Sequence, residues 1–255
     1  MHVVPPVLGA NTSVIPEDGQ GRSPSTCPAY DPGMTATGRP GWPLFDLRIA
    51  TPDLQIRPMT EADLPEVAQV IPDDLEIDPA APRFEGLSWR EQLGVTSAQS
   101  YWRSLGTWSV DSWNVVFAIR HGGALVGSQG LEGDDFLRLR TVDSWSYLGR
   151  EARGLGWGKQ MRRAVLSLAF GHLGAEFAIT SAWHDNHASL GVSRSLGYVD
   201  NGIERHRRDD GEHKTVDDMV HLRMSREQWE RSGGSAGITV EGFEPCRPSF
   251  GLAAD

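Results

Sequence analysis

The sequence predicts one α/β domain, and three features of the chain indicate this fold class. Residues 114–120 and 124–131 flank a His121-Gly122-Gly123 turn in the manner of a β-hairpin, which residues 138–149 continue as a third strand. A glycine-rich turn at 153–158 then runs directly into an amphipathic helix. A buried strand at 175–183 precedes a second helix, which starts near Asn186 and ends in Leu196-Gly197-Tyr198. An antiparallel meander followed by strand-and-helix units suits 255 residues with one well-buried core.

The flanking segments complete this plan. Residues 54–59 alternate like a first strand, and Thr60 is the expected N-cap of a helix that reaches about Val70. A proline- and acid-rich segment at 72–85 leads to a helix at 88–105. Residues 202–208 and 216–224 predict a terminal hairpin with its turn at 209–212, and 225–229 predict a short capped helix.

The two ends differ in composition from the domain, which we expect to span residues 41–230. Residues 1–40 are rich in Pro, Gly, Ser and Thr and predict a disordered leader, within which Met34 is an alternative start of translation. The tail, 231–255, is mixed in character and is expected to pack on the domain, with Ile238-Thr239-Val240 as an edge strand.

Charge and cysteine content exclude several classes of function. A net charge of −10 argues against a nucleic-acid scaffold and suits a cationic substrate better. Cys27 and Cys246 are too few for a disulfide framework or a thiolate zinc site, and no H-E-x-x-H spacing is present, so no metal is expected. The N-terminus lacks a basic signal region and no apolar run reaches membrane-spanning length, which predicts a cytoplasmic protein without a membrane partner.

The glycine-rich turn predicts a binding site for a pyrophosphate. Glycines let backbone N–H groups approach a ligand, and the start of the following helix adds a partial positive charge. Lys159 is followed by Gln160 instead of Ser or Thr, so this is not a nucleoside-triphosphate loop, and the spacing does not match the dinucleotide fingerprint. Apolar side chains of the helix share one face, whereas Lys159, Arg162 and Arg163 are expected elsewhere around the cylinder.

The pattern Arg153-x-x-Gly156-x-Gly158 resembles the coenzyme A loop of the GCN5-related N-acetyltransferase (GNAT) superfamily. The strand at 175–183, the Asn186-x-x-Ser189 helix and its leucine-glycine-aromatic end strengthen the resemblance, which covers roughly residues 42–229 and is closest to the RimJ/RimL-like branch. It implies a central mixed, mostly antiparallel sheet of six to seven strands, splayed at the acetyl-CoA site and flanked by helices. It also implies acetyl-CoA as co-substrate and an amine as acceptor. Members are commonly dimers, so a homodimer stays open.

The resemblance carries over a set of cofactor-binding residues. A backbone N–H near Tyr147 or Leu148 would contact the thioester carbonyl, and Asn186 and Ser189 the pantetheine arm. The pyrophosphate would be held by the loop, which comprises Arg153, Gly154, Leu155, Gly156, Trp157, Gly158 and Lys159.

Catalysis requires a base for the incoming amine and stabilisation of the leaving thiolate. Glu132 and Asp143 are the first candidates for the base, with Asp185 and Glu204 as others. Many family members carry a tyrosine acid seven residues after the asparagine, whereas this chain has Ser193, which is the candidate acid here.

The sequence does not decide to which class of compound the acceptor amine belongs. A protein or peptide N-terminus is favoured by the RimJ/RimL resemblance, and a small amine such as an antibiotic or polyamine is the alternative. The acidic segment 72–85 would suit a cationic amine, or is a solvated loop. The missing tyrosine leaves a third reading, a non-catalytic coenzyme A sensor.

Overall fold

A computed structural model describes residues 41–75, 81–209 and 214–253 of the chain. The predicted leader and most of the predicted 209–212 turn lie outside these described residues. Within the described residues, no helix is both long enough and apolar enough to cross a membrane.

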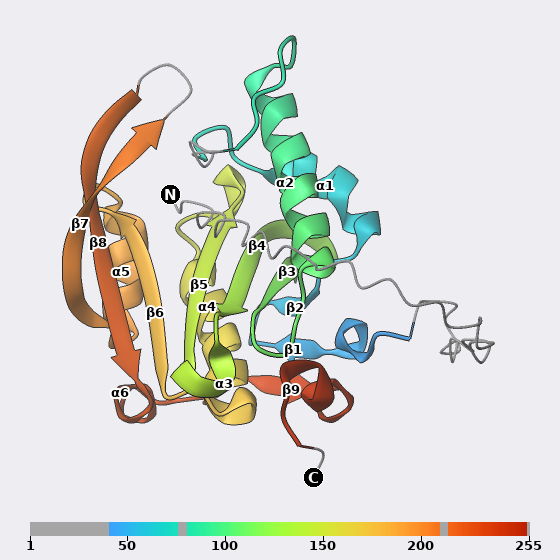
Figure 1. Ribbon diagram of the computed structural model, residues 1–255, viewed down its shortest axis with the longest axis vertical. Helices are drawn as coiled ribbons and strands as arrows, with labels where there is room; N and C mark the ends of the chain where they lie inside the picture. Colours follow the sequence, from blue (N-terminus) through green and yellow to red (C-terminus); the bar gives the residue numbers. More distant parts are fainter. Residues whose placement is uncertain (1–40, 76–80, 210–213, 254–255) are drawn as a thin grey trace, which may run out of the picture. The chain divides into compact units, whose positions relative to one another are not determined.

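The core of the fold is a nine-stranded mixed sheet with strand order β7-β8-β6-β5-β4-β3-β2-β1-β9 (Figure 1). Neighbouring strands are antiparallel except for β5 and β6, which run parallel. The strands are β1 (Arg48–Ala50), β2 (Gln55–Pro58), β3 (Trp113–His121), β4 (Ala124–Gly133), β5 (Thr141–Leu148), β6 (Phe177–Trp183), β7 (Val199–Asp209), β8 (Lys214–Ser225) and β9 (Thr239–Glu241). The mixed α/β fold expected from the sequence is confirmed.

The sheet exceeds the expected six to seven strands because both ends of the domain extend one edge. β1 pairs with β2, and β9 from the tail pairs with β1 through Ile49 and Val240. After β9, a 3₁₀ segment (Glu244–Phe250) buries Phe250 against Trp108 and Trp113 at ring distances of 5.3 and 4.9 Å. The tail therefore contributes to the core.

Helices cover both faces of the sheet. On one face, α1 (Leu64–Val70) and α2 (Trp89–Gly106) pack over β3 and β4. On the other, α4 (Trp157–Leu168) contacts β4 and β5, and α5 (His187–Ser195) contacts β6 (Figure 1). Two short helices, α3 (Phe136–Leu139) and α6 (Arg226–Arg231), flank strand ends. Because α3 occupies residues 136–139, the third strand of the meander starts at Thr141 and not at the expected residue 138.

Asp63 stabilises the entry to α1 through a buried ion cluster. It is 2% exposed, and its carboxylate accepts hydrogen bonds from Arg57, Arg120 and Thr60. Burial alone would raise the pKa of Asp63, but the hydrogen bonds from Arg57, Thr60 and Arg120 outweigh burial and hold it well below its usual range.

Replacing Asp63 by Ala is expected to lower the free energy of unfolding by about 3–5 kcal/mol, because two arginines lose a buried partner. Since the folded pKa is depressed, this stabilisation is present above the carboxyl's usual pKa and disappears as the pH falls toward the folded one. Urea denaturation of both proteins at pH 7 and pH 3 measures the difference. If the difference in free energy of unfolding between the two proteins is as large at pH 3 as at pH 7, the ionised Asp63 carboxylate is not its cause.

Candidate active site

The glycine-rich turn lies between β5 and α4 and presents unused backbone donors. Gly154 and Gly156 have φ angles of 79° and 80°, which side chains rarely adopt, and a Cβ on either would point into open space. In the described part of the chain, the N–H groups of residues 154–158 donate no recorded hydrogen bond, whereas those of Lys159 and Gln160 donate to the Gly156 carbonyl. The turn therefore fits the anion site predicted from the sequence.

The side chains of the turn differ in what they contact. Leu155 is 56% exposed and Lys159 is exposed at the start of α4. Trp157 packs against His121, with ring centroids 4.4 Å apart. Gly158 lies near Leu148 and Val192, and a Cβ added there would be 3.8 Å from a side-chain carbon of each, at ordinary van der Waals distance.

The turn is tied to the acidic segment that follows α1. Arg153 donates from both terminal nitrogens to the two carboxylate oxygens of Asp74, each at 2.8 Å, and Arg150 pairs with Asp73 at 2.8 Å. These two carboxylates are therefore paired with arginines in and just before the turn, and the choice between a selector of cationic amines and a solvated loop stays a prediction. Glu76 and Asp78 of the same segment lie outside the described residues.

Replacing Asp74 by Asn is expected to strengthen coenzyme A binding two- to fivefold, because Arg153 is then free to meet a phosphate. The effect is small since exposed ion pairs contribute about 0–1 kcal/mol. Titration calorimetry of the variant measures it, and Asp111→Asn, at an exposed acid outside the turn, controls for the change in net charge. Weaker binding in the Asp74 variant would instead show that the ion pair orders the turn.

β5 separates from β6 beside this turn. The parallel pairing covers only three residue pairs, from Thr141–Phe177 to Asp143–Ile179 (Figure 1). Residues 144–148 of β5, including Tyr147 and Leu148, therefore lie beyond the last pair with β6. This is the splayed arrangement that the resemblance implied.

Glu132 and Asp143 lie directly opposite each other on β4 and β5. They share the sheet face that α2 covers, because side chains alternate along a strand and Trp145 and Tyr147 point the same way. Asn114 on β3 donates to Glu132 at 3.2 Å, and the backbone N–H of Ser144 donates to Asp143 at 2.6 Å. The structure thus brings together two of the three predicted catalytic residues.

The surroundings of this carboxylate pair raise the pKa of both groups. For Glu132, burial and the neighbouring Asp143 raise the pKa to about 8. For Asp143, burial raises the pKa to about 6, opposed by the Ser144 N–H and by Arg162. Both side chains nevertheless keep partial exposure, so a ligand can reach them. The pair therefore carries one exchangeable proton near neutral pH, which is a suitable state for a general base.

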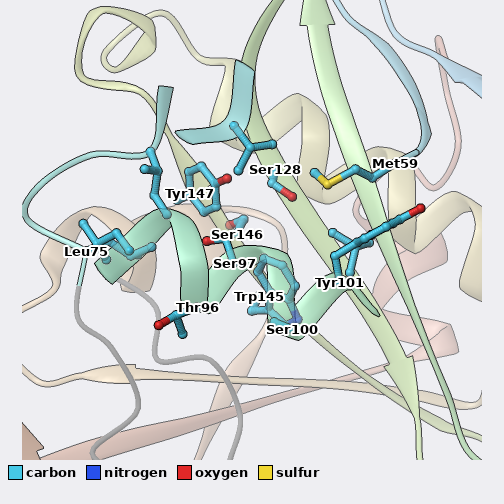
Figure 2. A pocket seen from close by; sticks show the side chains of 14 residues that line it. Met59, Leu75, Thr96, Ser97, Ser100, Tyr101, Ser128, Trp145, Ser146 and Tyr147 are labelled. Atoms are coloured by element: carbon cyan, nitrogen blue, oxygen red, sulfur yellow. The ribbon is translucent and has the colours of Figure 1, made fainter. Parts of the chain in front are cut away.

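A cavity of about 40 Å³ lies on the same face of the sheet as the pair, between α2 and the strands, and Trp145, two residues after Asp143, is part of its wall (Figure 2). Its apolar wall includes Met59, Leu75 and Trp145, and hydroxyl groups of Ser97, Ser128 and Tyr147 face it (Figure 2). Burial raises the pKa of Tyr147, which therefore stays protonated. Among the tryptophans, Trp145 lines this cavity, whereas Trp113 and Trp183 are buried in the core.

The second half of the site lies at the start of α5. The Asn186 side chain accepts a hydrogen bond from the Ser189 N–H at 3.1 Å and so caps the helix. Ser193, one turn further on, is 1% exposed, and its hydroxyl has no partner in the described structure. The predicted acid is therefore inside the protein and on α5, whereas the carboxylate pair lies on strands β4 and β5.

Two functional candidates were missed by sequence reasoning. Arg162 was expected away from the apolar face of its helix, and no function was assigned to it, but its side chain is 2% exposed. It is buried because β4, β5 and α5 all contact α4. The signal was present: Val165, Leu166 and Ala169, at i+3, i+4 and i+7 from Arg162, are all fully buried. Tyr198, named from the sequence only as part of the turn that ends α5, is buried and places its hydroxyl beside Ser144 and Arg162.

The remaining base candidates do not join the pair. Asp185 forms an exposed ion pair with Arg208 at 2.9 Å. Glu204 lies on the β7–β8 hairpin near His206 and His221, at 3.2 and 3.6 Å. Those three side chains could together hold a metal ion, although two of them are exposed.

Comparison with known proteins agrees with the fold and the turn. The family model described as the GNAT acetyltransferase domain matches residues 53–199. Among solved structures, a T. thermophilus protein described as an acetyltransferase is 21% identical with a TM-score of 0.55, and the match covers 72% of this chain and 92% of that one. RimJ from Mycobacterium smegmatis, in complex with CoA-disulfide, is 14% identical with a TM-score of 0.55, covering 75% and 96%.

A chimera containing the spermidine N-acetyltransferase SpeG from Vibrio cholerae is 13% identical with a TM-score of 0.51, covering 70% and 98% of the two chains. At identities this low, the structural similarity shows that the proteins share a fold and nothing more. The family match, by contrast, spans more than half of the chain and includes the glycine-rich turn and α5. The resemblance found in the sequence is thereby confirmed, and the chain belongs to the GNAT family of acetyltransferases.

Proposed function

We propose that this protein transfers an acetyl group from acetyl-CoA to a primary amine by direct attack in a ternary complex. The observation that carries the proposal is the carboxylate pair, Glu132 and Asp143, beside the point where β5 leaves β6. The turn at residues 153–158 lies at the far end of the same strand. Cofactor site and base are therefore joined by β5.

Acetyl-CoA would bind along this strand. Its pyrophosphate would accept hydrogen bonds from the free N–H groups of the turn, with Arg153 and Lys159 adding positive charge. The pantetheine arm would follow β5 between Ser144 and Leu148, with the thioester carbonyl at a backbone N–H near Tyr147 or Leu148. Asn186 and Ser189, at the start of α5, would contact the arm from the β6 side.

The chemistry requires the amine to lose a proton as its nitrogen attacks the thioester carbon. Asp143, with a pKa of about 6, is mostly ionised at neutral pH and can take that proton directly or through a water. Glu132, with a pKa of about 8, stays mostly protonated and so does not compete for the same proton. The carbon–sulfur bond then breaks, and its electron pair stays on sulfur.

The favoured acceptor is the N-terminal amine of a protein or peptide with a small first side chain. The cavity beside the pair has room for only a few heavy atoms, and its hydroxyls and apolar wall suit a residue such as Ser, Thr or Ala. A polyamine is the second candidate, because the carboxylate pair could also bind an ammonium group.

Titration calorimetry with acetyl-CoA, followed by thiol release with separate acceptor pools, tests the proposal. The pools are peptides with small N-terminal residues, peptides with large ones, polyamines, and amino-sugar antibiotics. Turnover confined to small-residue peptides supports the proposed acceptor, and turnover on polyamines or antibiotics alone would replace it. Binding without any turnover would favour the coenzyme A sensor, and lack of binding would refute the use of acetyl-CoA.

A further inference from the structure

Arg162 is a buried cation without an adequate partner. It lies in the second turn of α4 and is 2% exposed. Its Nη2 forms a long hydrogen bond to Ser146 Oγ at 3.5 Å, and its charge acts on Asp143 and Tyr198, but Nε and Nη1 have no hydrogen-bond partner in the described structure. A buried guanidinium normally requires several acceptors, since removing a charge from water is costly. The arrangement therefore suggests that an anionic group is missing from this place.

Three buried hydroxyl groups, on β5, on α5 and just after α5, also lack a hydrogen-bond partner in the part of the chain that the structure describes. Ser144 Oγ, Ser193 Oγ and the Tyr198 hydroxyl are buried and have no hydrogen-bond partner in the described residues. Tyr198 is close to both Ser144 and Arg162, and its backbone N–H donates to the Ser193 carbonyl at 3.3 Å. We call Arg162, Ser144, Ser146, Ser193 and Tyr198 the buried polar cluster. Several unsatisfied groups in one place are rare in native proteins and point to an absent ligand.

The cluster lies where the cofactor arm would pass. Ser144 alternates with Asp143 and Trp145, so it faces the side of the sheet that α4 covers, whereas Ser146, which accepts a hydrogen bond from Arg162, also lines the acceptor cavity. Both serines belong to the part of β5 that has left β6. The thioester of a bound acyl-CoA would thus lie between the carboxylate pair on one side and the buried polar cluster on the other.

We propose that Arg162 binds the sulfur of coenzyme A and stabilises the thiolate as it leaves, with the Tyr198 hydroxyl as a second hydrogen-bond donor. This inference rests on the proposed acetyl transfer. In that step the amine nitrogen bonds to the thioester carbon, its proton passes to Asp143, and the carbon–sulfur electron pair stays on sulfur. The thiolate leaves as an anion paired with Arg162 and takes a proton from water after release.

Charge stabilisation explains the absence of the family's tyrosine better than proton donation by Ser193. A thiol has a pKa of about 8.5, and a serine hydroxyl is a far weaker acid, so transfer from Ser193 to a thiolate would be strongly uphill. A neighbouring cation, by contrast, lowers thiol pKa values to about 3.5–7.5 in proteins. With Arg162 in place, the leaving group needs no proton at neutral pH.

The thiol of enzyme-bound coenzyme A reports directly on this contact and requires no acceptor. We would titrate it by the ultraviolet absorbance of the thiolate in the wild type, Arg162→Met, Arg162→Lys and Arg163→Met. The expected pKa of the bound thiol is about 7 or lower in the wild type, about 8.5 or higher in Arg162→Met, and intermediate in Arg162→Lys. Arg163, whose guanidinium donates to the Gly234 carbonyl at 2.7 Å, is the matched control and should leave the titration unchanged.

Thermal unfolding separates this role from a structural one. Removing a buried charge that lacks a partner should leave the melting temperature of Arg162→Met unchanged or raised. A normal thiol pKa in the wild-type complex, or a lowered thiol pKa in the Arg162→Met complex, would overturn the inference about Arg162 and leave the proposed acetyl transfer untouched. A lower melting temperature with an unchanged thiol pKa would show that Arg162 is structural. Failure of the wild type to bind coenzyme A would overturn the proposed function as well.

Discussion

Replacing Asp143 by Asn is expected to reduce kcat for acetyl transfer about 10²- to 10⁴-fold, because the variant cannot accept the proton of the attacking amine. The affinity for acetyl-CoA should be unchanged, since Asp143 lies on the acceptor side of β5. Steady-state thiol release, together with calorimetry of acetyl-CoA binding, separates the two effects. Glu132→Gln should be milder, because Glu132 is mostly protonated at neutral pH.

The pH profile identifies the base. In the wild type, kcat/KM should rise with pH through about 6, because burial raises the pKa of Asp143 to that value and only the ionised form accepts a proton. This rise should be absent in Asp143→Asn. Asp134→Asn, at an exposed acid hydrogen-bonded to Ser112, removes the same charge nearby and should keep the wild-type profile. A profile that survives in Asp143→Asn would exclude Asp143 as the base.

Replacing Gly156 by Glu is expected to abolish measurable coenzyme A binding, with at least a hundredfold loss of affinity. The position has φ of 80°, which a non-glycine residue adopts only with strain, and the new carboxylate would occupy the space in front of the free N–H groups. Calorimetry with coenzyme A measures the loss directly.

Two control variants separate the contributions of backbone strain and of the added charge to this loss of affinity. Gly156→Ala imposes the strained backbone without the charge and should weaken binding only partly. Leu155→Glu places the same charge on an exposed neighbouring residue, where it can turn away from the site. Retention of wild-type affinity in Gly156→Glu would mean that the pyrophosphate binds elsewhere.

The features that could be predicted from the sequence are those that depend on residues close together in the chain. The turn at 153–158, the helix start at Asn186 and the hairpin of β3 and β4 depend on residues a few positions apart, and all were predicted. The start of β5 was misplaced, because Arg140 adopts a left-handed conformation with φ of 46° after α3. Such a conformation is uncommon outside glycine and leaves little trace in composition.

Glu132 and Asp143 illustrate which part of the site the sequence predicts and which part depends on the tertiary structure. Each was a candidate because it lies near the meander strands that face the site in the resembled fold, but their alignment depends on the register of β4 against β5. A shift of one residue would have placed one carboxylate on the opposite face of the sheet. The raised pKa values likewise depend on burial beneath α2, a helix that lies well before both residues in the chain.

By itself, the sequence determined the order of the elements, the glycine-rich turn and the family, because these depend on local backbone preferences and short spacings. Only the tertiary structure decided which side chains meet: Asp74 with Arg153, Glu132 with Asp143, and Arg162 with Tyr198 behind the sheet. The reason is physical, since partners and solvent exposure are set by packing between distant segments, and the ionisation of a side chain depends on both.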